Sequence, residues 1–389
     1  MNIERNHILL ILLIILSCCF LPSLTRAEIR TESELSFWWI IHEEMETGAL
    51  QAGTQDKAAQ EASGFSLNKA RLSFYYLIPE HHILSKVKLR MEENFILYDA
   101  YLSYQPSSLF QVYLGQMKIP STYEVLTEDA KLDFITRTSL SSNIVNYSLS
   151  KTPYISALQG VNCYMRDMGV GIKGSWNAGQ DHDLFRYFVM VGNGLGANLY
   201  VGGREKKNFI MSNEFGEYFY GIRAEMSPEE SVKLGAHYNR NIHHDMLFKD
   251  EKTVYDLDRT SYSVDLHLSI APDFRITGLY GEGVVDDDWF RDGKKNYEFS
   301  GWEFRILKGF LNNKLELGLR YDTYEFEYNE SGDVTRENHW TYGISYNPYP
   351  ALRLQLNYIT KNTVSDCEAD LDDDIILLNV ALLFKAGIK

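Results

Sequence analysis

The chain has 389 residues with 38 basic and 53 acidic side chains, and its net charge of −15 at pH 7 argues against a nucleic-acid-binding function, which depends on phosphate contacts. Its four cysteines are too few for a disulfide scaffold. No segment after the N-terminal region approaches 18 consecutive apolar residues, which excludes a later transmembrane helix but not membrane-spanning strands.

Residues 1–27 are predicted to be a secretory signal peptide. Arg5 supplies positive charge, an apolar run extends from His7 to Leu21, and Thr25-Arg26-Ala27 offers a cleavage site. A retained membrane anchor, for which the run is short, and a lipoprotein processing site at Cys18 are the alternatives. Residues 28–389 then form one predicted domain.

A hydrophobic period of two marks the rest of the chain and is clearest between residues 313 and 358. There Leu317 and Leu319 alternate with Gly318 and Arg320, which predicts strands with one apolar and one polar face. A soluble sandwich would also alternate, so strand number and connections decide between the classes. The pattern predicts sixteen strands, at residues 33–42, 65–77, 83–93, 97–105, 109–119, 166–175, 184–192, 215–227, 230–241, 259–270, 273–284, 296–307, 314–327, 338–347, 351–361 and 374–385.

The connections alternate in length along the chain. Short turns, many with proline, alternate with long polar connections at 43–64, 120–165, 193–214, 242–258, 285–295, 328–337 and 362–373. Outer-membrane barrels place short turns opposite long loops, whereas a Greek-key sandwich has no reason to sort its connections in this way. We therefore predict an all-β fold, a single transmembrane antiparallel β-barrel of about 16 strands.

Five stretches carry a family resemblance, at 97–124, 166–174, 191–198, 340–359 and 373–384, and the most characteristic is Gly-Gln-Met-Lys-Ile-Pro at 115–120. They resemble the phosphate-selective porin O and P family of Gram-negative outer membranes. The resemblance implies a homotrimeric 16-stranded channel whose long third outer loop, here 120–165, folds into the lumen. Individual phosphate-binding positions do not align, and Lys385 to Lys389 extend beyond the aromatic end that is usual for such barrels.

The alternation also predicts which charged side chains face the lumen. If the apolar positions of each strand face lipid, the others face water. Basic residues at the water-facing positions are Lys69, Arg71, Lys86, Lys88, Arg90, Lys173, Arg186, Arg223, Lys233, Arg275, Arg305, Arg320 and Arg353. Acidic residues at these positions are Glu34, Glu92, Asp99, Glu225, Asp265, Glu303, Glu316 and Asp322. The predicted lumen is basic and would favour anions, unless these cations pair with the wall acids as a stabilising lattice.

The long connections suggest further candidates. Lys131, Arg137 and Lys151 are candidate residues of a constriction in loop 120–165, where nearby acids leave the charge almost balanced. Cys163 and Cys367 both fall in predicted outer loops, where they could form a disulfide. Acidic clusters such as Asp370 to Asp374 could bridge divalent cations to lipopolysaccharide, or could simply remain solvated.

The predicted function is an outer-membrane porin for passive diffusion of small hydrophilic solutes, favouring anions such as phosphate. The alternative is a structural or adhesive barrel with incidental or non-selective channel activity. His267 and Ser269 lie at lumen positions and no Gly-x-Ser-x-Gly element occurs, so no catalytic residues, cofactor or metal site are predicted. The expected partners are outer-membrane lipid and lipopolysaccharide, small anionic or polar solutes, and two further copies of the chain.

Overall fold

The computed structural model describes residues 28–42, 64–91, 96–144, 165–179, 181–194, 218–247, 254–287, 297–328, 332–366 and 371–388. These residues form sixteen strands. The strands are β1 Glu28–His42, β2 Gly64–Ile78, β3 Ile83–Arg90, β4 Ile96–Tyr104, β5 Gln111–Lys118, β6 Arg166–Trp176, β7 Phe185–Gly192, β8 Phe219–Glu229, β9 Val232–Leu247, β10 Val254–Ala271, β11 Phe274–Asp287, β12 Tyr297–Phe310, β13 Leu315–Tyr328, β14 Val334–Tyr349, β15 Leu352–Ser365 and β16 Leu371–Ile388.

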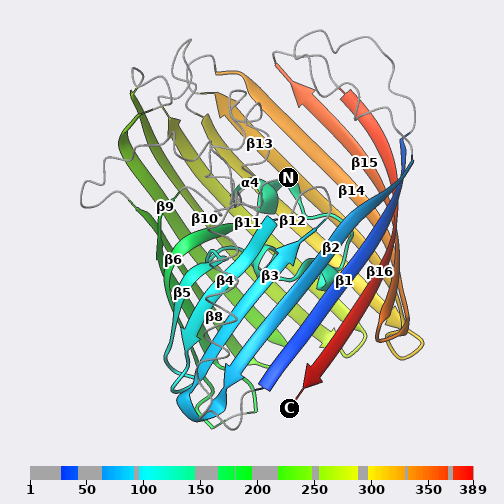
Figure 1. The fold of residues 1–389 in the computed structure, drawn as a ribbon. Helices are drawn as coiled ribbons and strands as arrows, with labels where there is room; N and C mark the ends of the chain where they lie inside the picture. The colour runs from blue at the N-terminus through cyan, green and yellow to red at the C-terminus, as the bar shows by residue number, and fades with distance from the viewer. Residues whose placement is uncertain are drawn as a thin grey trace, which may run out of the picture.

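The strands form one closed antiparallel barrel in which each pairs with its neighbours in sequence (Figure 1). The barrel closes where β1 pairs with β16, from Ile29 opposite Ile388 to His42 opposite Ile375. Closure leaves no sheet edge, which is the condition for a sheet to cross lipid. The prediction of a 16-stranded transmembrane-type barrel is confirmed.

The strand bounds differ from the prediction mainly at the ends. β10 begins at Val254 rather than 259, β14 at Val334 rather than 338, and β16 runs to Ile388 rather than 385. Backbone pairing continues through these stretches because ladder hydrogen bonds do not depend on alternating apolar side chains. Lys385 to Ile388 are therefore part of the closing strand.

The outward side chains are apolar and the inward ones polar, as β15 illustrates. There Leu356 is 40% exposed whereas Asn357 is 1% exposed. Aromatic rings form a row on the outer face of β12 to β14, where the Tyr321 ring centroid lies 5.0 Å from Trp302 and 4.5 Å from Trp340. A girdle of amphipathic rings is typical of barrels that stand in a bilayer.

Residues 119–144, which follow β5, lie within the barrel and are called the inner segment (Figure 1). The inner segment contains α3 (Tyr123–Leu126), the 3-10 turn η2 (Asp129–Lys131) and α4 (Ser139–Ile144); a further 3-10 turn, η1 (Pro79–His81), joins β2 to β3. The predicted loop continues through residues 145–164, which lie outside the described residues, so inward folding of the whole loop stays a prediction. Within the described ranges, no helix is long and apolar enough to span a membrane.

The outer face predicts a depth-dependent cost of charge on β10. Val264 is 54% exposed near the middle of the strand, and Ile270 is 63% exposed near the short-turn rim. We expect Val264→Arg to lower the unfolding free energy by about 2–4 kcal/mol and Ile270→Arg by about 0–1 kcal/mol. Guanidinium unfolding in lipid vesicles measures both, and equal losses would contradict a lipid-facing Val264.

Candidate functional site

A β-bulge in β4 turns two adjacent side chains toward the inside of the barrel. The register between β3 and β4 shifts after Lys88, which faces Asp99, and leaves Tyr98 unpaired in the ladder. Tyr98 and Asp99 are both buried, at 5% and 4% exposure. Bulges commonly redirect side chains in this way.

The Gly115-Gln116 pair in β5 fits around this bulge. Gln116 Nε2 donates to the carbonyls of Leu97 and Tyr98 at 2.6 and 2.9 Å. Gly115 has φ +126°, and a Cβ there would clash with the Ala100 carbonyl oxygen, so only glycine fits. The sequence motif at 115–120 therefore begins with residues that fix the bulge.

Lys118 and Arg137 give the inner segment its shape. Lys118 Nζ donates to the carbonyls of Val125, Leu126 and Thr127 at 2.8, 3.1 and 2.7 Å, at the C-terminal end of α3. Arg137 donates to the Glu124 carbonyl at 3.2 Å and again to the Thr127 carbonyl at 2.9 Å. Both cations thus satisfy carbonyls that a one-turn helix leaves unpaired.

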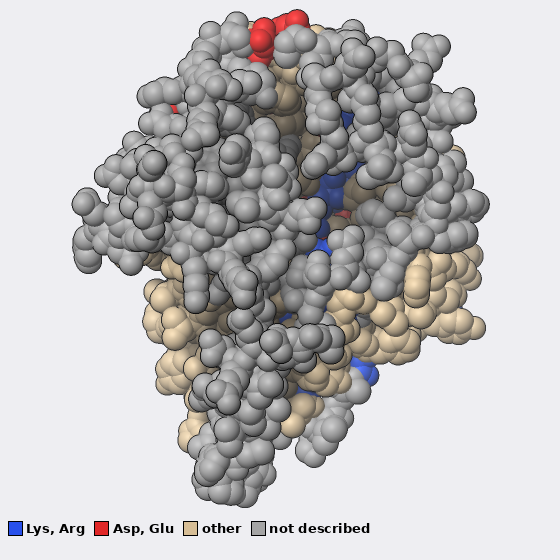
Figure 2. Space-filling model, turned by 45° about the horizontal axis from the view of Figure 1, so that its top comes forward, with Lys and Arg blue, Asp and Glu red and all other residues tan. Residues whose placement is uncertain are grey.

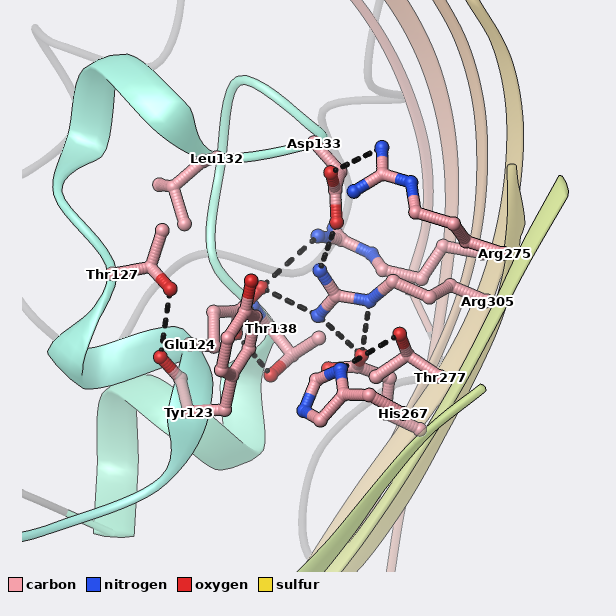
Figure 3. A network of polar contacts seen from close by, with 12 residues as sticks. Tyr123, Glu124, Thr127, Leu132, Asp133, Thr138, His267, Arg275, Thr277 and Arg305 are labelled. Atoms are coloured by element: carbon pink, nitrogen blue, oxygen red, sulfur yellow. Dashed lines mark hydrogen bonds and ion pairs between the residues drawn. The ribbon is translucent and has the colours of Figure 1, made fainter. Parts of the chain in front are cut away.

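Ion pairs hold one side of the inner segment to the wall (Figure 3). Arg305 of β12 is 2% exposed, and its guanidinium contacts Glu124 at 2.8 Å, Asp133 at 3.2 Å and the neighbouring Glu303. Arg275 of β11 contacts the other oxygen of Asp133 at 3.1 Å. The second oxygen of Glu124 accepts from the backbone and hydroxyl of Thr138 at 3.0 Å each.

Cross-strand glycine pairs make room for apolar side chains of the segment. Gly318 of β13 faces Gly343 of β14, and a Cβ at either position would lie 2.9 or 2.8 Å from the Phe134 ring. Arg320 covers this ring with its guanidinium 4.9 Å from the centroid. On β11 and β12, Gly281 faces Gly301, and a Cβ on Gly281 would lie 2.5 Å from the side chain of Ile144.

The segment also reaches the opposite side of the barrel. Asp129 pairs with Arg71 of β2, and Arg353 of β15 donates to the Ala130 carbonyl at 2.8 Å. Contacts with β2, β12, β13 and β15 together hold the inner segment across the interior. Figure 2 shows Lys and Arg atoms deep in a hollow at the end of the barrel opposite the short turns.

Part of the barrel interior is apolar, which departs from the rule that apolar side chains face lipid. Phe188 and Met190 of β7 and Phe299 of β12 are at most 6% exposed and pack with Val125 and Leu140 of the inner segment. These positions lie on the same strand faces as Arg186 and Glu303, which the alternation assigned to the inside, but they carry apolar side chains there. The inner segment buries them, so they face neither lipid nor water.

Most of the predicted lumen cations lie in ion pairs. Arg223 contacts Asp265 at 2.6 Å, Lys86 contacts Asp99 at 3.3 Å, and Arg320 contacts Asp322 at 3.1 Å. Arg186 and Arg275 are more exposed but also pair with carboxylates. The stabilising lattice that the sequence left open as an alternative is thus present. The side chains of Lys69, Glu34 and Glu92 lie outside the described residues.

Four of the predicted cations form no ion pair with any carboxylate that the structure describes. Lys173 lies over the rings of Tyr113 and Phe188, at 4.5 and 4.2 Å from their centroids, and Arg353 contacts only a carbonyl and a hydroxyl. The other two are Lys88 and Lys233. By contrast, each predicted lumen acid with a described side chain is paired. The described inner wall therefore keeps a positive excess.

The three constriction candidates differ in their surroundings. The Lys131 side chain is 68% exposed and, in the part of the chain that the structure describes, pairs only with Glu128, at 3.0 Å. Arg137 is 13% exposed and pairs with Asp129 at 2.5 Å, so it links two parts of the inner segment. Lys151 lies outside the described residues, as do Cys163 and Cys367.

Sequence reasoning missed Lys118 and Arg166. Arg166 is 3% exposed, pairs with Asp99 at 2.5 Å and stacks on Tyr98 at 3.8 Å. Both residues lie at the inner-segment ends of their strands, where the strict alternation of faces breaks down. The Gly-Gln-Met-Lys motif was the available signal for Lys118.

Solved structures of outer-membrane proteins share this fold. A loop-deletion mutant of OmpT, an outer membrane protein of Vibrio cholerae, has a TM-score of 0.63 at 10% identity over 92% of this chain and 99% of that one. The outer membrane channel DcaP of Acinetobacter baumannii has a TM-score of 0.61 at 10% identity, over 92% of this chain and 97% of that one. An anion-selective porin from Comamonas acidovorans has a TM-score of 0.55 at 10% identity, over 92% of this chain and 99% of that one.

No protein-family model matches the chain. No curated protein matches it either. At about 10% identity the likeness establishes the fold alone, which is that of outer-membrane porins. This closed barrel with its apolar exterior places the chain in the outer membrane.

Removal of Arg305 should destabilise the protein strongly. Arg305→Met leaves Glu124 and Glu303 buried without their main counter-charge, and we expect a loss of about 3–5 kcal/mol in unfolding free energy. The exposed outer pair of Arg336 with Glu325 provides the control, since Arg336→Met should cost about 0–1 kcal/mol. Denaturant unfolding in vesicles compares them, and similar losses would show that the inner network adds no stability.

Docking of the inner segment should weaken in acid. Burial by itself raises the pKa of Glu124, but the Arg305 and Arg320 guanidiniums outweigh it and lower the pKa from 4.5 to about 2. Because the docked carboxyl has the lower pKa, its contribution is full above pH 4.5 and is lost as the pH falls toward 2. Hydrogen-exchange protection of residues 119–144 should fall in this window.

The control for this pH dependence is a pair of substitutions. Glu124→Gln should remove most of the change in protection, whereas Glu229→Gln, at the exposed end of β8, should leave it intact. Unchanged protection of residues 119–144 between pH 5 and pH 2 in the unmodified protein would contradict the assigned role of Glu124.

Proposed function

We propose that the protein is an outer-membrane porin whose water-filled channel allows passive diffusion of small hydrophilic solutes and favours anions such as phosphate. The fold supports the channel, since a barrel of sixteen strands is wide enough to leave an aqueous lumen where its own segments do not fill it. The inner segment crosses that lumen and narrows it. Two of the structural neighbours are an outer membrane channel and an anion-selective porin.

One observation carries the anion preference. Each predicted lumen carboxylate with a described side chain is neutralised by a cation, whereas Lys173, Lys233 and Arg353 keep unpaired charge among the described residues. Unpaired cations in a narrow, partly desolvated passage lower the electrostatic barrier for anions and raise it for cations. The net charge of −15 therefore does not set the sign of the potential along the inner wall.

The environment of the proposed channel follows from the same features. We propose that residues 1–27 direct export and are removed, and that the outer face contacts lipid and lipopolysaccharide. We further propose a homotrimer, as the family resemblance implies; OmpT of Vibrio cholerae, one of the structural neighbours, has been solved in a trimer form.

Conductance in planar bilayers measures the proposed selectivity. In a potassium chloride gradient, the zero-current potential should move toward the equilibrium potential of chloride. Replacing two unpaired cations, with Lys173→Met and Arg353→Met together, should reduce the anion-to-cation permeability ratio roughly twofold or more. Lys314→Met, in an exposed turn, should leave the ratio unchanged.

Two results would contradict the proposal. Cation selectivity of the unmodified channel would remove the anion preference and leave the porin. The absence of discrete conductance steps would favour the alternative, a structural barrel without a working channel.

A further inference from the structure

A cavity of about 230 Å³ lies between the barrel wall and the inner segment. Strands β2 and β3 border it on one side, and the inner segment and the residue that begins β6 border it on the other. Its cationic lining consists of Arg71, Lys88, Arg90, Lys118, Arg137 and Arg166. Among the described residues, two carboxylates, those of Glu128 and Asp129, share the lining, so positive charge dominates the described part of the cavity.

Lys88 is the residue whose surroundings call for a ligand. Its side chain is 8% exposed, and in the β3–β4 register it faces Asp99. The Asp99 carboxylate instead contacts Arg166 at 2.5 Å and Lys86 at 3.3 Å. Lys88 forms neither a hydrogen bond nor an ion pair with any residue in the described part of the chain. A buried ammonium without a counter-charge is costly, which favours binding of an anion beside it.

The groups around Lys88 are held in place by other contacts. Asp129 is shared between Arg71 and Arg137, which come from the wall and from the inner segment. Lys118 is fixed by three carbonyls, which orient its ammonium without neutralising its charge. The Tyr98 ring, stacked on Arg166 at 3.8 Å, closes the wall side. The cavity is thus preorganised, with donors that suit oxyanions.

We propose that this cavity binds one small oxyanion, a phosphate, sulfate or carboxylate group, with Lys88 as its principal counter-charge. An anion there would contact cations of the wall and of the inner segment at once, and would stabilise their attachment. The volume suits such a group, since one water occupies about 30 Å³ in the liquid. This role is separate from the proposed channel function, because the anion is retained at the segment and its binding does not depend on conduction.

Thermal unfolding of the mature protein in detergent tests the proposal, with phosphate, sulfate or acetate replacing chloride at constant ionic strength. We expect a saturable rise in melting temperature with at least one of the three anions. The anion that produces this rise shows whether the cavity takes a phosphate, a sulfate or a carboxylate group. Equilibrium dialysis with radiolabelled anion should find one bound equivalent per chain. No saturable response to any of them would overturn the proposal.

Substitution of Lys88 separates a ligand site from a structural lysine. Lys88→Met should weaken anion binding about tenfold or more and abolish the anion-dependent rise, whereas Lys314→Met should retain both. In chloride, Lys88→Met should melt at or above the temperature of the unmodified protein, because an unpaired buried charge is gone. Lys88→Gln serves as a second variant if the first does not fold. An anion response retained in the variants would overturn the assignment to Lys88.

The zero-current potential of the same variants distinguishes the proposed anion cavity from the proposed channel selectivity. Loss of anion stabilisation with an unchanged reversal potential would support the cavity and leave channel selectivity to the other cations. Loss of channel selectivity in the unmodified protein would leave the thermal result unaffected.

Discussion

Backbone hydrogen bonding in hydrocarbon is the constraint on which the rest of the structure depends. Lipid offers no partner to an unpaired peptide group, so a sheet crosses a membrane only when its last strand pairs with its first. The pairing of β1 with β16 from Ile29 to His42 meets this requirement along almost the whole length of β1. Once the sheet is closed, one face of every strand must suit lipid and the other must suit the interior.

The interior is far less wet than a simple ring of charged side chains would suggest. The inner segment covers an apolar cluster around Phe188 and Phe299 and buries Arg305 and Glu124 with it. Charges in such a setting stay ionised only where opposite charges or several donors surround them. The paired cations therefore fix the segment, and the smaller unpaired group sets the potential that an entering ion meets. The cations that hold the segment and those that set the potential both lie at inward strand positions. They differ in whether a carboxylate lies beside them.

The sequence predicted much of the fold because period-two alternation reports directly on burial. It located all sixteen strands, and it assigned to the inside Arg305 and Arg320, which are 2% and 1% exposed in the structure. It put Phe188 and Met190 on the same face as Arg186, but it could not reveal that the inner segment covers them, because that contact joins parts of the chain far apart in sequence. It also missed Arg166, since the bulge at Tyr98 and the chain entry at β6 break the alternation. Partners such as Arg305 and Glu124 lie far apart in sequence, so only the folded chain shows that they meet.

The inner segment lies early in the chain, yet its contacts come mostly from strands made much later. Glu124 needs β12 for its contact with Arg305, and Phe134 needs β13 and β14 for its place against Gly318 and Gly343. Contacts between such distant parts of a chain form slowly, because a long loop must first be closed. The barrel is therefore expected to assemble before the inner segment docks inside it. A late folding intermediate would then have a hydrated lumen without the docked segment. The last event in folding of this protein would then be the expulsion of water from the part of the interior that the inner segment covers.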